Sequence, residues 1–169
     1  MLSLIPGLLI YLSTHPAENC TSKPKLTMTT FQPRIVVFAC NWCSYAGADL
    51  AGVSRIQYPP TTRVIRVMCS GRVQPGFILE AFNHGADGVL ITGCHPGDCH
   101  YISGNENAVA TVEKTAQLMD LLGIENERLR LEWISAAEGA RFARIMTEFT
   151  EQIQALGQSP LSEDRGIAA

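Results

Sequence analysis

Four short apolar runs along the chain have the composition of buried β-strands. The first, Ile35 to Ala39, is continuously apolar, which is typical of a strand covered on both faces of a parallel sheet. Similar runs recur further along the chain. The pattern predicts strands over residues 35–39, 64–68, 88–92 and 129–134.

Helical periodicity fills the intervals between these runs. A short glycine- and alanine-rich helix is predicted after Ala46, and two others over residues 75–83 and 105–122. In the helix over residues 105–122, apolar residues recur at helical spacing and predict one buried face. The residues of this face are Val109, Val112, Ala116, Met119 and Leu122. A capping-box pattern, Ser135 with Glu138, predicts the start of a final helix that ends before Gly157.

Strands that alternate with helices of this length indicate an α/β domain. The connections predict a single open, mainly parallel sheet of about four strands with flanking helices, joined by right-handed crossovers in the flavodoxin-like or Rossmann-like manner. We assign this domain to residues 34–157. Residues 1–33, apolar and then polar, are predicted to be an extension outside the fold, and residues 158–169 a flexible tail.

Composition narrows the classes of function. A chain of 169 residues suits one domain with tails, and its 46% hydrophobic and 17% charged residues are ordinary for a globular protein. The net charge of −3, with its cations scattered, argues against nucleic acid as a partner. The apolar stretch over residues 1–12 lacks a preceding cation and is shorter than the roughly 20 residues that span a bilayer, so we expect no membrane partner.

Cysteine placement is the strongest chemical signal in the chain. Of six cysteines, five lie in three segments that each begin where a predicted strand ends. They are Cys40, Cys43, Cys69, Cys94 and Cys99. Because the carboxyl ends of parallel strands share one edge of a sheet, we expect these five sulfurs to converge. The spacing is unlike a secreted disulfide scaffold and favours metal or redox chemistry in a reducing compartment, the cytoplasm.

An iron–sulfur cluster is the cofactor that this pattern favours. A 2Fe-2S centre needs about four thiolates, and the spacing allows one pair at Cys40 and Cys43 and another at Cys94 and Cys99. In the alternative assignment Cys69 is a ligand and one of the paired residues is not, so the choice of four among five stays open. Three neighbouring side chains could tune the potential of the cluster by charge or hydrogen bonding. They are Arg72, His95 and His100.

Two other chemistries fit part of the pattern. A strand followed by Cys-x-x-Cys and a helix is the order of a thioredoxin-like dithiol motif, but three further cysteines are surplus to that mechanism. A zinc-stabilised docking module accepts four cysteines, or three with a histidine, and His95 and His100 adjoin the cysteines. Zinc usually supports a small fold without its own core, whereas this sheet is predicted to have one.

Three separated motifs resemble a known family. The segments starting at Cys40 (CNWCSYAGAD), Arg66 (RVMCSGR) and Gly93 (GCHPGDCHY) are similar, in this order, to the delta subunit of methyl-viologen-reducing hydrogenase. The resemblance covers roughly residues 33–157 and includes all five cysteine positions. It implies a 2Fe-2S subunit without turnover of its own. Such a subunit passes electrons between a hydrogenase or formate dehydrogenase and the flavin-bearing subunit of heterodisulfide reductase.

Overall fold

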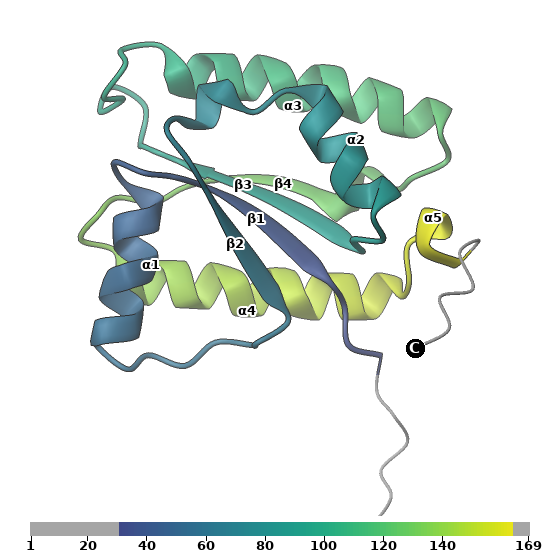
Figure 1. The fold of residues 1–169 in the computed structure, drawn as a ribbon, viewed down its shortest axis with the longest axis horizontal. Coiled ribbons are helices and arrows are strands. Elements are labelled where there is room, and N and C mark those ends of the chain that lie inside the picture. Colours follow the sequence, from purple (N-terminus) through teal and green to yellow (C-terminus); the bar gives the residue numbers. More distant parts are fainter. Residues whose placement is uncertain (1–30, 164–169) are drawn as a thin grey trace, which may run out of the picture. The chain divides into compact units, whose positions relative to one another are not determined.

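Four parallel strands form the centre of the fold in the computed structural model, which describes residues 31–163. The strands are β1 (Ile35–Cys40), β2 (Thr62–Val67), β3 (Gly88–Gly93) and β4 (Leu129–Trp133). They lie in the order β2-β1-β3-β4, and each neighbouring pair is parallel (Figure 1). The expected open parallel sheet with flanking helices is therefore confirmed.

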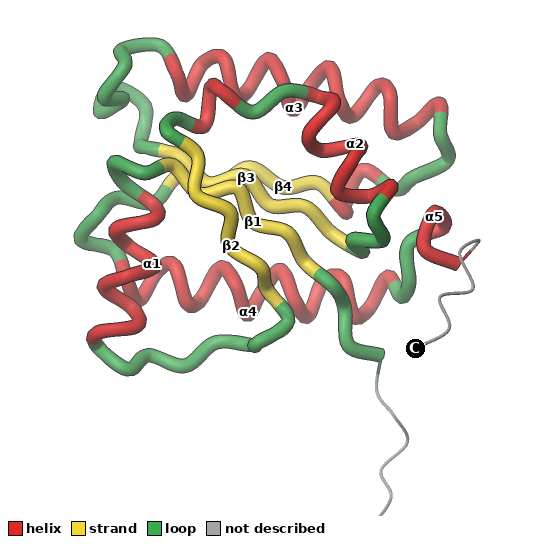
Figure 2. Tube along the Cα trace, in the orientation of Figure 1, coloured by secondary structure: helices red, strands yellow, loops and turns green. Residues whose placement is uncertain are grey.

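Helices cover both faces of this sheet. Helices α1 (Ser44–Val53) and α4 (Gly139–Leu156) lie on one face, and α2 (Pro75–Asn83) and α3 (Gly104–Leu121) lie on the other, so that the strands run between two helical layers (Figure 2). Three shorter elements complete the described chain. They are the 3-10 turns η1 (Ser70–Arg72) and η2 (Asn126–Arg128) and the short helix α5 (Pro160–Glu163).

The core has two layers because successive side chains of a strand point to opposite faces of the sheet. On one side Val37 and Leu90 pack with Phe142 of α4. On the other, Val89 and Ile91 pack with side chains of α2 and α3. Strand β3 is buried along its whole length, which explains the continuous apolar run in its sequence.

The buried face of helix α3 is shifted from the one expected, although Val112 and Met119 of the expected face do pack in the core. Met119 is fully buried as predicted, but Val109 and Leu122 are 38% and 52% exposed. Ala108 and Thr115 occupy the buried positions instead. Thr115 can be buried because its hydroxyl donates to a backbone carbonyl one turn earlier, at 2.7 Å, which gives this polar group a partner inside the helix.

The final long helix also begins later than the capping-box pattern predicts. Glu138, not Ser135, is the N-cap residue, and α4 starts at Gly139. One half of the expected capping box does form, since the Glu138 carboxylate accepts the Ser135 backbone N–H at 2.7 Å. The same carboxylate also contacts His95, so the turn before α4 is fastened to the loop after β3.

Residues 158–163, expected to belong to a flexible tail, are held against the domain. The Ser159 N–H and the Ser162 hydroxyl donate to the same Asp87 carboxylate oxygen, at 3.0 and 3.2 Å. Arg128 donates to the carbonyl of Gln158 at 3.1 Å. These bonds attach residues 158–163 to the domain. The extension up to residue 30, with Cys20, and residues 164–169 lie outside the described residues.

Within the part of the chain that the structure describes, no helix is long and apolar enough to cross a membrane.

Candidate metal centre

Four of the five cysteines follow the two strands that flank the switch point of the sheet, and the fifth, Cys69, follows the neighbouring strand β2. In a β2-β1-β3-β4 sheet the connections leave β1 and β3 in opposite directions, and ligands bind in the crevice outside the carboxyl ends of these two strands. Cys40 is the last residue of β1, and Cys94 directly follows β3. Cys43 is the N-cap residue of α1, and Cys69 precedes η1 after β2. Cys99 lies in the loop before α3.

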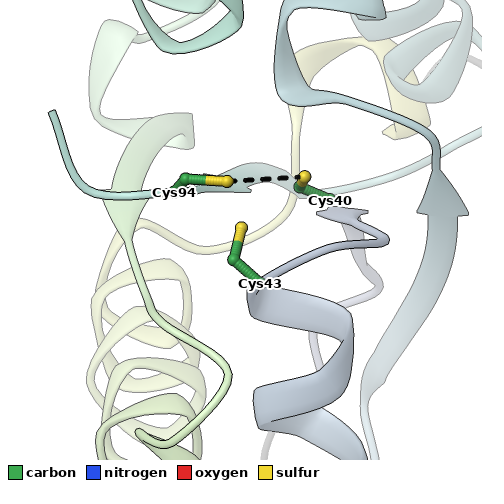
Figure 3. Close-up of side chains that lie close together, drawn as sticks. All are labelled: Cys40, Cys43 and Cys94. Atoms are coloured by element: carbon green, nitrogen blue, oxygen red, sulfur yellow. Dashed lines mark hydrogen bonds between the residues drawn. The ribbon is translucent and has the colours of Figure 1, made fainter. Parts of the chain in front are cut away.

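Three of the sulfurs form a compact group. The Sγ atoms of Cys40, Cys43 and Cys94 all lie within 4.8 Å of one another, and all three residues are buried. The Sγ atoms of Cys40 and Cys94 are 3.9 Å apart, and the sulfur of Cys43 points toward them from the start of α1 (Figure 3). Two thiolates on one tetrahedral metal with bonds of about 2.3 Å lie about 3.8 Å apart, so this group has the spacing of metal ligands.

The other two sulfurs meet at the start of α3. The Gly104 N–H donates to the Sγ atom of Cys99 at 3.2 Å. A methyl group added to Gly104 would come within 2.9 Å of that sulfur and would overlap the Sγ atom of Cys69. Both sulfurs therefore border the same Cα atom. Spacing allowed Cys94 to pair with Cys99, whereas the structure gathers Cys94 with the three-sulfur group and Cys99 with Cys69.

A tight turn separates Cys94 from Cys99. The Asp98 N–H donates to the His95 carbonyl at 3.0 Å, with Pro96 and Gly97 between them. Gly97 has a φ of +91°, which a type II turn requires at this position and which glycine adopts without steric cost. The loop is thereby redirected away from the switch point and toward α3.

Within the three-sulfur group, the ionisation of one thiol affects the pKa of its neighbours. The hydrogen bond from Cys43 lowers the pKa of Cys40 to about 5, and the same contact raises the pKa of the Cys43 thiol above its ordinary value. Burial raises the pKa of Cys94 and also that of Cys69. One thiolate thus makes the next harder to form, and a bound cation would remove this penalty. The donor set therefore fits a thiophilic metal centre.

Aromatic side chains line the exposed rim of the site. The rings of Trp42 and His100 stack with their centroids 3.9 Å apart, and Trp42 Nε1 donates to the Tyr101 hydroxyl at 3.3 Å. His100, expected to tune the ligands, therefore packs on Trp42. A cavity of about 270 Å³ opens between this rim and the sulfurs of Cys43 and Cys94.

His95 and Arg72, the other two expected neighbours, have different surroundings. His95 Nε2 donates to the Glu138 carboxylate at 2.7 Å, and this bond holds the pKa of Glu138 down at about 2. Arg72 lines a second cavity, of about 440 Å³, together with Cys69 and Gly104. A larger cavity of about 650 Å³ lies between α2 and the β1 and β2 strands, and the described residues that line it include no cysteine.

Two buried hydroxyls that support the site were missed by the sequence analysis. Ser44 Oγ accepts the Cys40 N–H at 2.9 Å and donates to the Thr92 carbonyl at 3.0 Å, while the Thr92 hydroxyl donates back to it at 2.9 Å. These bonds tie the end of β1 to the end of β3 beside the cysteines. A threonine inside an otherwise apolar buried strand was the available signal, because a buried hydroxyl needs a partner.

The fold and the site together define a class: an α/β protein with a thiolate-rich metal site at the switch point of its parallel sheet. The chain belongs to the family described as methyl-viologen-reducing hydrogenase, delta subunit, which matches residues 35–157. The resemblance read from the three motifs is thereby confirmed.

Relatives of two architectures share this domain. The chain is 55% identical over 136 residues to the iron-sulfur subunit of the vhc F420-non-reducing hydrogenase of Methanococcus voltae, covering 80% of this chain and 94% of that protein. It is 56% identical over 127 residues to the F420-non-reducing hydrogenase iron-sulfur subunit of Archaeoglobus profundus, covering 75% and 93%. It is also 51% identical over 125 residues to a Ferredoxin:CoB-CoM heterodisulfide reductase subunit of Methanosarcina mazei, covering 74% of this chain but 16% of that larger protein.

Proposed function

We propose that this chain is a cytoplasmic electron-transfer subunit. It would hold a 2Fe-2S cluster and carry electrons between a hydrogenase or formate dehydrogenase and the flavin subunit of a heterodisulfide reductase-type complex. The observation that carries the proposal is the convergence of five cysteine sulfurs at one sheet edge, three of them within 4.8 Å of one another. Iron–sulfur clusters are held by cysteine thiolates.

The division of the sulfurs supports a centre with two irons. Each iron of a 2Fe-2S cluster takes two protein ligands. The Cys69 and Cys99 pair offers one such set, and the three-sulfur group offers the other with one sulfur to spare. The two sets adjoin, since the Cys40 sulfur also lies 3.8 Å from the carbonyl oxygen of Met68, the residue before Cys69. When bound, the cluster would supply one-electron exchange, while the protein supplies position and potential.

The relatives and the surface support a role inside a complex. Relatives are named as iron-sulfur subunits of hydrogenases, and another is a heterodisulfide reductase subunit that contains a domain similar to this one. Beside the sulfurs, the side chains of Trp42, Tyr101 and Ile102 are 47%, 50% and 88% exposed. Apolar side chains that gather at a rim are typical of surfaces that contact another protein.

Burial argues against dithiol exchange as the function. A thiol that attacks a substrate disulfide must be accessible as well as acidic. Within the Cys-x-x-Cys pair, Cys40 has the lowered pKa, but it is 1% exposed, and Cys43 beside it is 5% exposed. A pair of thiols buried in this way suits a resident metal better than an incoming substrate.

The decisive experiment is metal analysis of the protein purified without oxygen. We expect about two irons and two sulfides per chain, a brown colour that bleaches with dithionite, and an EPR signal after reduction. A colourless protein with stoichiometric zinc would refute the relay and establish the zinc-stabilised docking module. In the described residues no histidine joins the three-sulfur group, so a zinc site there would need a further thiolate.

The choice of four ligands can be made by single substitutions. Cys-to-Ser changes at each of the five positions should abolish the cluster at four of them and spare it at one. Retention of a full cluster in every variant would contradict cysteine ligation by this set.

The direction of electron flow needs the assembled complex. With its hydrogenase partner bound, the cluster signal should appear under hydrogen and fade when the heterodisulfide is added. A cluster that stays oxidised under hydrogen, while the flavin of the complex is reduced, would show that electrons bypass this chain.

A further inference from the structure

We propose that Gly104 and Gly71 are positioning residues that form a backbone cradle for the sulfurs of Cys69 and Cys99. The cradle lets the amino end of α3 approach these sulfurs directly, and we infer that it sets the reduction potential of the centre. This inference rests on the proposed function, because it concerns the cysteine pair that would bind one side of the cluster.

The first part of the cradle is the contact of Gly104 with both sulfurs. Its N–H donates to Cys99 Sγ at 3.2 Å, and its Cα leaves no room for a methyl group beside the Sγ atoms of Cys69 and Cys99. Any side chain at this position would have to push at least one of the two sulfurs away. Glycine is therefore required here by the approach of the ligands.

The second part is a contact between two backbones. A methyl group on Gly71 would lie 2.5 Å from the carbonyl oxygen and 2.8 Å from the Cα atom of Gly104. The turn η1, which directly follows Cys69, therefore touches the start of α3 with no side chain between them. This close packing brings Cys69 to the same point as Cys99, although the two cysteines lie in loops after different strands.

Several amides converge on Cys99 at this helix end. The backbone N–H groups of Tyr101, Asn105 and Gly104 hydrogen-bond to the Cys99 sulfur, that of Gly104 at 3.2 Å. Helix α3 runs from Gly104 to Leu121, so its positive dipole end faces the sulfur. Amide N–H groups and a helix amino end place positive partial charge beside the sulfur, which favours the added electron of a reduced cluster, and hydrogen bonds to sulfur are among the factors that set cluster potentials.

The main test compares Gly104→Ala with a matched control in the full-length chain. Gly76→Ala is suited as the control, because Gly76 also lies in the first turn of a helix and a methyl group there meets nothing within 4 Å. Circular dichroism and thermal unfolding of the metal-free proteins would verify that both fold. We expect Gly104→Ala to lose most of the iron, or to hold a cluster with a more negative midpoint potential and an altered EPR signal. Gly76→Ala should match wild type in both.

Cadmium binding gives a readout that does not depend on iron. Titration of the metal-free proteins with Cd²⁺, followed by cadmium–thiolate absorption, should show an affinity about 10-fold weaker for Gly104→Ala, as for other changes that misplace a ligand. Gly71→Ala should weaken Cd²⁺ binding as well, because it separates η1 from α3.

The outcomes distinguish this inference from the proposed function. Wild-type iron content, potential and Cd²⁺ affinity in folded Gly104→Ala would overturn the cradle and leave the relay intact. A wild-type protein that binds Cd²⁺ but no iron would overturn the relay, and the Cd²⁺ titrations of the two glycine variants would still decide whether the cradle exists.

Discussion

The two ends of the sheet both bury polar or ionisable groups, but they satisfy them differently. At the amino end of β3, Asp87 accepts the Arg34 N–H at 2.8 Å and the Ser159 N–H at 3.0 Å. Arg128, 1% exposed, donates to the carbonyls of Asp87 and Gly157 at 3.1 and 2.8 Å. At the carboxyl end, the buried thiols of Cys40, Cys43 and Cys94 have one another as side-chain partners.

This difference separates a structural polar cluster from a chemical one. Buried polar groups are costly unless they are hydrogen-bonded, and the protein alone supplies the partners around Asp87 and Arg128. Those bonds fasten the start of β1 and the chain after α4 to the sheet. The sulfurs instead gain their strongest partner only when a metal is bound. We therefore expect changes at the amino end to affect folding, and changes at the carboxyl end to affect the metal.

The largest expected effect is the loss of the metal in a double variant. Cys40→Ser combined with Cys94→Ser leaves three of the five cysteines, fewer than the four thiolates that a 2Fe-2S cluster needs. We expect iron analysis to find no cluster, while the free energy of unfolding of the metal-free protein changes by less than about 2 kcal/mol. Cys20→Ser is the control and should keep the cluster. Iron retention in the double variant would contradict the expectation that the cysteines at the carboxyl end of the sheet bind the metal.

Among these variants, Arg128→Met should cause the largest fall in the free energy of unfolding. It leaves all five cysteines in place. The change leaves several buried carbonyl oxygens without a donor, so we expect the free energy of unfolding to fall by about 3–5 kcal/mol. Urea denaturation of the metal-free protein measures this fall. The control Arg144→Met removes a side chain that is 62% exposed and 3.7 Å from Glu148, and should cost less than about 1 kcal/mol. Similar falls in the free energy of unfolding in both variants would show that the buried hydrogen bonds of Arg128 do not stabilise the fold more than an exposed ion pair does.

Asp87→Ala should have an intermediate effect on stability. It removes the acceptor shared by the Ser159 N–H and the Ser162 hydroxyl, together with that of the Arg34 N–H, and we expect a loss of about 2–3 kcal/mol. A double-mutant cycle with Ser162→Ala isolates one of these bonds. If the two changes are simply additive in urea denaturation, the hydroxyl does not depend on Asp87 and the proposed anchoring is wrong.

The smallest effect should be a pH dependence from Glu138. Its pKa in the folded protein is about 2, below the ordinary value of 4.5, because of the bonds from His95 and the Ser135 N–H. The carboxylate therefore contributes stability above pH 4.5, and this contribution is lost as the pH falls from 4.5 toward 2. Since the side chain is 35% exposed, solvent screening keeps the contribution below about 1 kcal/mol.

Denaturation of wild type and Glu138→Gln across this pH range measures that contribution. Wild type should lose stability more steeply than the variant, and the two curves should converge near pH 2. Parallel curves would show that Glu138 has no special partner in the folded protein.

The sequence by itself determined where the strands lie and that the cysteines follow them. A strand buried in a sheet has a local run of apolar residues, and this run can be recognised without knowledge of the tertiary structure. The sequence also determined that the five sulfurs face one edge, since parallel strands leave no other choice. The buried face of α3 was predicted only in part. Its apolar period is weak, and the buried Thr115 satisfies its own hydroxyl within the helix.

Only the tertiary structure decided how the sulfurs divide into three and two. That division depends on the turn at Gly97, which carries Cys99 away from Cys94, and on the contact of Gly71 with Gly104, which brings Cys69 beside it. Likewise, the polar segment after α4 is held by Asp87, a residue more than 70 positions earlier in the chain. Such contacts join loops that are distant in sequence. Periodicity and motif spacing describe only neighbouring residues, so they do not determine where a loop lies relative to the rest of the fold.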